Sequence, residues 1–242
     1  MKSDTTHLKQ KTPLVFLHGW KQDKQTWNTV ISHLEAEFAC YAPDLPGFGA
    51  RPKPENSWSI PQYAEWVQQY CNEHSIKNPV LIGHSFGGRV AIVLATEMKL
   101  SGLVLYATPG LPQPLSRFTS LAQALHHALK KTAIPFDKTK TFKKISDRFR
   151  SADYLESDQL QQIFLNVVNF DLTPYFDQIT ASTLLLWGEK DTEVPLTVAR
   201  AMEQMIPETR LQIIPHASHF AHRENPSLFA GIIRNFVGNH HG

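Results

Sequence analysis

Apolar residues along the chain fall into two alternating kinds of segment. Short apolar runs rich in strand-forming residues predict β-strands at residues 13–17, 40–43, 79–82, 103–106, 183–187 and 211–214. Between them, apolar residues three or four positions apart predict helices at residues 25–37, 60–74, 87–97, 196–205 and 226–237. Repeated strand and helix segments are typical of a mostly parallel sheet with helices on both faces. The pattern therefore predicts an α/β fold.

The alternation is interrupted once, between residues 111 and 178. This stretch is helix-like, contains no strong strand signal and holds few large apolar residues for a core of its own. The strands on either side must also be neighbours if the parallel topology is right-handed. We therefore expect residues 1–110 and 179–242 to form one core domain, and residues 111–178 to form a helical cap inserted over one edge of the sheet.

The composition is that of a globular protein without a strong overall charge. The chain has 242 residues, of which 42% are hydrophobic, and a formal net charge of +2 from 24 basic and 22 acidic residues. This charge gives no field that would attract nucleic acid or an anionic membrane. The polar N-terminus lacks a secretory apolar segment, and no apolar run approaches the ~20 residues of a membrane helix. We expect a cytoplasmic protein that binds neither nucleic acid nor membrane.

A candidate nucleophile, Ser85, lies between a predicted strand and a predicted helix. Residues 83–87 have the sequence Gly-His-Ser-Phe-Gly, a G-x-S-x-G motif. A serine at such a sharp turn requires very small residues two positions before and after it, which the two glycines provide. The helix N-terminus favours developing negative charge, so the Phe86 N–H is a candidate oxyanion donor. The Trp20 N–H, in the loop after the first strand, is the second candidate.

A nucleophilic serine needs a histidine base and a carboxylate that orients it. Asp191 ends a Gly-Glu-Lys-Asp turn after the strand at residues 183–187, and should reach the same sheet edge as Ser85. Glu189 and Glu193 are the neighbouring alternatives. Asp191 is the predicted orienting acid.

The predicted base is His219, in the loop between the last strand and the last helix. Three histidines lie in this loop. His219 is at its apex, whereas His216 is still near the strand end and His222 is in the turn that leads into the final helix. We therefore prefer His219 and keep the other two as alternatives.

Five motifs together resemble the α/β-hydrolase superfamily across nearly the whole chain. They are His-Gly-Trp at 18–20, Asp-Leu-Pro-Gly-Phe-Gly at 44–49, Gly-His-Ser-Phe-Gly-Gly at 83–88, Trp-Gly-Glu-Lys-Asp at 187–191 and His-Phe-Ala-His-Arg-Glu-Asn-Pro at 219–226. The resemblance implies the α/β-hydrolase fold, with its order of serine, acid and histidine along the chain. About a dozen polar residues precede the first strand, so we expect the family's N-terminal hairpin to be trimmed.

The resemblance also implies a serine hydrolase of the carboxylesterase type, acting on a small acyl substrate without a cofactor or metal. A serine at position 85 excludes the haloalkane dehalogenases and epoxide hydrolases, which have aspartate there. Thioester and C–C bond hydrolysis remain possible. Arg89 and the C-terminal motif resemble the lyase-type menaquinone-pathway synthases, although those enzymes usually have a tyrosine where this chain has His84. A non-enzymatic binding protein on this fold is the opposing hypothesis.

Positive charge is concentrated in the expected cap. Residues 117–150 contain nine lysines or arginines against Asp137 and Asp147. A solvated helix face is the simpler interpretation of this excess. The alternative is docking of an acidic carrier protein, as in the pimeloyl carrier-protein methyl esterases, which this chain resembles in length and in its His-Gly-Trp motif.

Overall fold

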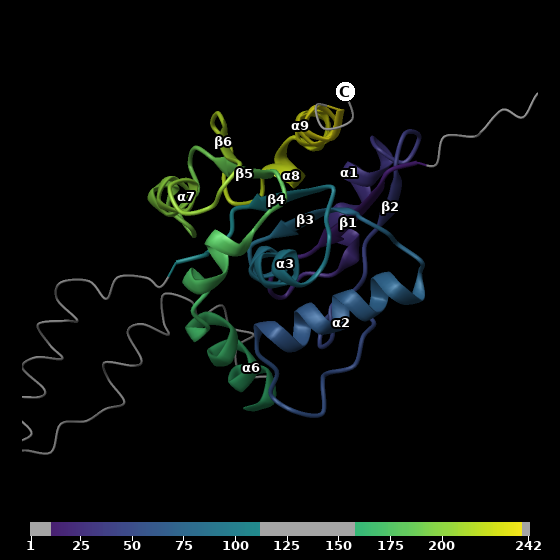
Figure 1. The fold of residues 1–242 in the computed structure, drawn as a ribbon, viewed down its shortest axis with the longest axis vertical. Coiled ribbons are helices and arrows are strands. Elements are labelled where there is room, and N and C mark those ends of the chain that lie inside the picture. The colour runs from purple at the N-terminus through teal and green to yellow at the C-terminus, as the bar shows by residue number, and fades with distance from the viewer. Residues whose placement is uncertain (1–10, 112–157, 239–242) are drawn as a thin grey trace, which may run out of the picture.

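A parallel β-sheet forms the centre of the molecule. The computed structural model describes residues 11–111 and 158–238, in which six strands pair in the order β2-β1-β3-β4-β5-β6, every neighbouring pair parallel (Figure 1). The strands are β1 (Pro13–Leu17), β2 (Ala39–Tyr41), β3 (Val80–His84), β4 (Gly102–Tyr106), β5 (Thr183–Gly188) and β6 (Thr209–Ile214). Within these ranges no strand precedes β1, and β2 forms one edge of the sheet.

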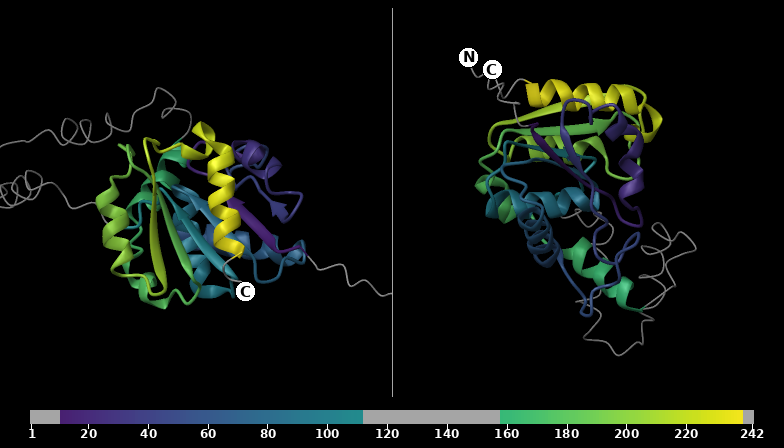
Figure 2. Two further views of the ribbon diagram at one scale, coloured as in Figure 1. Left: turned by 90° about the horizontal axis from the view of Figure 1, so that it is seen from above. Right: turned by 90° about the vertical axis from the view of Figure 1, so that its right-hand side faces the viewer.

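Helices cover both faces of this sheet. The described α-helices are α1 (Asn28–Ser32), α2 (Ile60–Glu73), α3 (Phe86–Glu97), α6 (Asp158–Asn169), α7 (Leu196–Glu203), α8 (Ala221–Glu224) and α9 (Pro226–Gly238), with 3-10 helices η1 (Lys24–Trp27) and η3 (Thr173–Gln178). Helices α2 and α3 lie against one face and α9 against the other (Figure 2). The predicted parallel sheet with helices on both faces is thus confirmed.

Alternating strand residues supply two separate apolar cores. In β1, Val15 and Leu17 pack on the face covered by α2 and α3, whereas Leu14 and Phe16 pack on the face covered by α9. All four side chains are completely buried. A strand that is buried on both faces has no polar positions to alternate with apolar ones, which is why the sequence shows continuous apolar runs.

The single long helix predicted at residues 25–37 is wrong. The chain forms the short 3-10 helix η1, then α1, which ends at Ser32. The Asp23 side chain accepts the Gln25 N–H at 2.8 Å and so caps the 3-10 turn. Helix α1 then ends in tighter bonds between residues three positions apart: the His33 and Leu34 N–H groups donate to the Val30 and Ile31 carbonyl oxygens, at 3.1 and 2.8 Å.

Apart from residue 111, only the last part of the predicted cap, from residue 158, lies within the described residues. There, α6 is tied to the core domain through Asn166, whose side-chain amide donates to the Ser57 carbonyl oxygen at 2.9 Å. Leu172, Phe176 and Ile179 are buried in the same core as α3. The basic segment at 117–150 lies outside the described residues, and the boundaries of the cap at 111 and 178 stay a prediction. None of the described helices is both long and apolar enough to cross a membrane.

Two helical glycines provide a matched test of how tightly α3 packs on the sheet. A Cβ atom on Gly87 would lie 2.4 Å from the Leu17 carbonyl oxygen, whereas a Cβ on Gly231 in α9 would meet nothing within 4 Å. Gly87→Ala should therefore lower the free energy of unfolding by about 3 kcal/mol, and Gly231→Ala should raise it by up to about 1 kcal/mol. Urea denaturation of both variants measures the difference. Equal shifts would contradict the close packing.

Candidate active site

Ser85 occupies a strained turn between β3 and α3. Its backbone has φ 49° and ψ −108°, a combination that side-chain-bearing residues rarely adopt. From Pro79 to Ala95, Ser85 is the one residue that is not buried. The predicted turn thus presents a hydroxyl at the surface of an otherwise buried strand and helix.

The structure brings Asp191 and His219 together as a buried pair. The Nδ1 atom of His219 lies 2.8 Å from Oδ2 of Asp191. The other Asp191 oxygen accepts the backbone N–H groups of Glu193 and Val194, both at 2.9 Å. This second oxygen fixes the carboxylate, so the pair holds the imidazole in one orientation with Nε2 directed away from Asp191.

The alternative histidines occupy different environments. The side chain of His216 is 82% exposed, and its Nδ1 lies 3.5 Å from Glu189. His222 is buried, and its Nε2 lies 2.9 Å from the Thr26 hydroxyl oxygen. Neither histidine contacts Asp191 in the described structure, whereas His219 does.

Glu193, an alternative acid, lies on the other side of the imidazole. Its Oε2 is 3.6 Å from Nε2 of His219, and its side chain is 56% exposed. Nε2 is the nitrogen that would have to face the serine if Asp191 orients the ring. Glu193 is therefore unsuited to the orienting role, and sequence spacing gave no signal that it would approach this nitrogen.

The sheet topology places the candidate residues at one edge. Ser85 follows β3, Asp191 follows β5 and His219 follows β6, and the carboxyl ends of parallel strands share an edge (Figure 1). The residue before the serine, His84, packs directly on His219, with ring centroids 4.7 Å apart.

The two predicted oxyanion donors are on adjacent segments. Phe86 is the first residue of α3, so its N–H has no acceptor within the helix. The Trp20 and Phe86 rings lie 5.4 Å apart between centroids, which brings the loop after β1 next to the start of α3. A Cβ on Gly19 would lie 2.9 Å from Nδ1 of His84, so the glycine allows this close approach.

An aromatic wall surrounds Trp20. Its ring centroid lies 4.9 Å from that of Phe48 and 5.2 Å from that of Phe164 in α6. Phe48 also contacts Phe86, at 5.7 Å. The site is thus apolar on the side of the Trp20 loop. The contact between Trp20 and Phe164 joins residues more than 100 positions apart and so carries no local sequence signal, whereas the motif at 44–49 drew attention to Phe48.

Three buried histidines act as neutral hydrogen-bonding groups. Burial lowers the pKa of His18, lowers that of His84 well below its ordinary value, and lowers that of His222 to about 3. Nε2 of His18 accepts the Leu45 N–H at 3.0 Å, so its proton is on Nδ1, which lies 2.8 Å from the Gly19 carbonyl oxygen. His18 therefore holds the 44–49 loop against the Trp20 loop.

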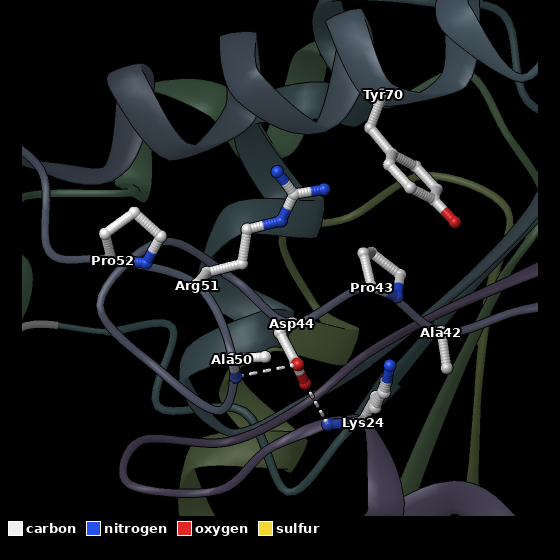
Figure 3. Close-up of a pocket in the computed structure, with 8 residues that line it drawn as sticks. All are labelled: Lys24, Ala42, Pro43, Asp44, Ala50, Arg51, Pro52 and Tyr70. Atoms are coloured by element: carbon white, nitrogen blue, oxygen red, sulfur yellow. Dashed lines mark hydrogen bonds between the residues drawn. The ribbon is translucent and has the colours of Figure 1, made fainter.

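The side chain of Asp44, in the same loop, accepts hydrogen bonds from the backbone. Its carboxylate accepts the Lys24 N–H at 2.8 Å and the Ala50 N–H at 3.0 Å (Figure 3). Beside it is a hollow of about 370 Å³, whose lining includes Arg51 and Tyr70 but none of the predicted site residues. Within the described ranges, no group of three or more His, Cys, Asp or Glu side chains is arranged to hold a metal ion.

Comparison with known proteins identifies the family. The model of a family described as "Alpha/beta hydrolase family" matches residues 14–232. The chain belongs to the alpha/beta hydrolase family. Among relatives of this alpha/beta hydrolase, the pimeloyl-[acyl-carrier protein] methyl ester esterase of Vibrio vulnificus is 27% identical over 248 residues, which cover 95% of each chain.

Solved structures show the same fold. MenH from S. aureus matches this alpha/beta hydrolase with a TM-score of 0.73 and 22% identity, over 98% of this chain and 97% of that one. The esterase EaEST from Exiguobacterium antarcticum matches with a TM-score of 0.73 and 19% identity, over 95% of this chain and 92% of that one. Identities this low establish the architecture alone.

Arg89, which carried part of the resemblance to the lyases, is engaged in packing. Its guanidinium is buried and donates to the carbonyl oxygens of Pro109 and Phe170. Burial lowers its pKa to about 10. Arg89 therefore ties α3 to the loop after β4 and to the end of α6.

The buried neutral histidines predict that this alpha/beta hydrolase loses stability in acid. An unfolded histidine titrates near pH 6.5, so below that pH the unfolded chain takes up protons that the folded chain refuses. Above pH 6.5 these histidines should leave the free energy of unfolding unchanged. Below pH 6.5 the free energy of unfolding should fall by up to about 1.4 kcal/mol per pH unit for each such histidine. For His222 the fall continues towards its folded pKa of about 3.

The contribution of one histidine can be isolated by urea denaturation between pH 4.5 and 8. His222→Asn should reduce the slope of the unfolding free energy against pH by the contribution of one proton, about 1.4 kcal/mol per pH unit. His33→Asn, at an exposed position on the surface, is the control. Identical slopes for His222→Asn and the parent chain would show that His222 is not kept neutral by the fold.

Proposed function

We propose that this alpha/beta hydrolase is a serine hydrolase that cleaves a small carboxylic ester through an acyl-enzyme on Ser85. The observation that carries the proposal is the buried hydrogen bond between Asp191 and His219, at the same edge of the sheet as a serine held in strained geometry. Strain of this kind persists at functional turns, where the surrounding structure imposes it.

The proposed mechanism assigns one task to each group. His219 accepts the Ser85 proton at Nε2, because Nδ1 is engaged by Asp191. The serine oxygen attacks the acyl carbon, and the alcohol leaves with the proton from His219. Water then attacks the acyl-enzyme by the same route. The Phe86 and Trp20 amides stabilise the negative oxygen that develops in both steps.

The aromatic wall around Trp20 and the similarity to known esterases narrow the class of substrate. Trp20, Phe48 and Phe164 favour an uncharged, apolar acyl chain next to the oxyanion donors. The similarity to a pimeloyl-[acyl-carrier protein] methyl ester esterase over 95% of both chains supports a methyl ester on a carrier-bound acyl chain as a specific candidate. The basic segment at residues 117–150 would then supply the docking charge for an acidic carrier protein.

Replacing the proposed nucleophile tests the reaction class. Ser85→Ala should lower kcat on a short-chain p-nitrophenyl ester by up to about a million-fold, the scale observed when a triad serine is removed. The parent chain should be labelled by a fluorophosphonate at Ser85, and the variant should not. Ser101→Ala is the control, since Ser101 lies just before β4, at the opposite edge of the sheet. Full activity of Ser85→Ala would refute the mechanism.

Salt dependence tests the carrier-protein substrate. Electrostatic docking predicts that kcat/KM for an acyl-carrier-protein methyl ester falls several-fold between 50 and 500 mM NaCl, because salt screens the attraction between exposed charges. The value for a p-nitrophenyl ester should change little over the same range. A thioester of the same acyl chain measures leaving-group preference. Salt-independent turnover of the carrier-bound ester would remove the docking proposal and leave the ester-hydrolase proposal intact.

A further inference from the structure

The backbone of His219 is held by two buried side chains outside the proposed triad. The Tyr106 hydroxyl donates to the His219 carbonyl oxygen at 2.6 Å, and Nε2 of His84 lies 3.1 Å from the same oxygen. A carbonyl oxygen only accepts, so Nε2 of His84 carries its proton. Tyr106 and His84 are completely buried. Both donors therefore restrain the main chain of the loop that carries the proposed base.

Tyr106 also contacts the backbone of the proposed nucleophile. It is the last residue of β4, between β3 and β5 in the sheet (Figure 1), and is paired with His84 in the register. Its carbonyl oxygen accepts the Ser85 N–H at 2.9 Å. One residue thus fixes the main chain of Ser85 through its carbonyl group and the main chain of His219 through its hydroxyl.

A chain of hydrogen bonds fixes the direction of the Tyr106 hydroxyl. Because Tyr106 donates to His219, its oxygen accepts at the longer distance of 3.4 Å from Nδ1 of His222. Nε2 of His222 is then unprotonated and accepts from the Thr26 hydroxyl at 2.9 Å. The Thr26 oxygen in turn accepts from Nε and Nη2 of Arg223, at 3.1 and 2.9 Å.

Every donor in this chain points from Arg223 towards the His219 carbonyl. Hydrogen bonds aligned in one direction polarise and strengthen one another. The arrangement requires a neutral His222, which agrees with the lowering of its pKa to about 3 by burial. The chain joins elements almost 200 residues apart in sequence and ends on the residue proposed as base.

We propose that Tyr106 is a positioning residue that keeps the His219 imidazole directed at Ser85. The inference rests on the proposed function, because it gives His219 the role of base. Asp191 holds the ring at Nδ1, whereas Tyr106 holds the main chain of His219 itself. The exposed carboxylate of Glu193, 3.6 Å from Nε2, offers the ring a competing partner if the loop shifts. The hydroxyl of Tyr106 opposes that shift through the backbone.

Removing one oxygen atom tests this role. Tyr106→Phe keeps the ring packing and should lower kcat on a p-nitrophenyl ester by about 10- to 100-fold, since small displacements of a reacting group cost that much. KM should stay within about two-fold of the parent value, because Tyr106 is buried behind His84 and His219 and does not reach a substrate. A loss confined to kcat separates positioning from general loosening of the fold.

Tyr63→Phe is the matched control. Tyr63 is equally buried and donates its hydroxyl to a backbone carbonyl oxygen, that of Pro46, at 3.1 Å. Both variants should shift the urea midpoint by a similar amount, and only Tyr106→Phe should lose turnover. If Tyr106→Phe retains kcat within two-fold of Tyr63→Phe, the positioning role is refuted.

Two further variants separate the possible failures. Thr26→Val interrupts the hydrogen-bond chain outside the core and should lower kcat by a few-fold with KM unchanged. If Tyr106→Phe does not fold, Thr26→Val takes its place as the test. An unchanged kcat of Thr26→Val then refutes the positioning role. His219→Ala tests the base itself. If it retains activity, the proposed function fails. If it is inactive while Tyr106→Phe is as active as its control, only the positioning role fails.

Discussion

The geometry of the site depends on how closely α3 approaches the sheet. At the start of this helix, Gly87 lies against the Leu17 carbonyl group and Gly88 against Thr108, with no room for a Cβ atom at either position. This contact forces the chain to leave β3 in a sharp turn, and Ser85 takes up the resulting strain. The partly exposed position of Ser85, the place of the Phe86 amide at the start of α3 and the proximity of the Trp20 loop are consequences of the same packing.

Buried histidines stabilise the loops around this turn without carrying charge. An imidazole that is kept neutral offers one donor and one acceptor in a rigid plane, which suits it to bridge two backbone segments. His18 joins the loops after β1 and β2, and His84 joins β3 to the loop after β6. Desolvation keeps both neutral. The dependence of stability on pH follows from this use of histidine in place of a charged or apolar residue.

Local features of the fold and of the site could be predicted from sequence. Strands such as β3 and β5 are continuous apolar runs, and the glycines around Ser85 indicate a tight turn directly. The pairing of His219 with Asp191 followed from the order of elements, since both follow strands that end at one edge. The helix predicted at residues 25–37 was wrong because the side-chain cap from Asp23 starts a 3-10 helix, and α1 already ends at Ser32 in bonds between residues three positions apart.

The features that sequence reasoning missed arise from contacts between distant segments. Tyr106 is the last residue of an apolar strand, a position typical of core residues. Its ring is completely buried. The hydroxyl gains its partner only when the loop after β6 folds over the end of β4, more than 100 residues later in the chain. Likewise, Glu193 is an ordinary exposed acid by sequence, and its distance from Nε2 of His219 depends on the turn after β5. Sequence motifs therefore indicate the candidate reacting groups, whereas the contacts that hold those groups in place are visible only in the assembled sheet.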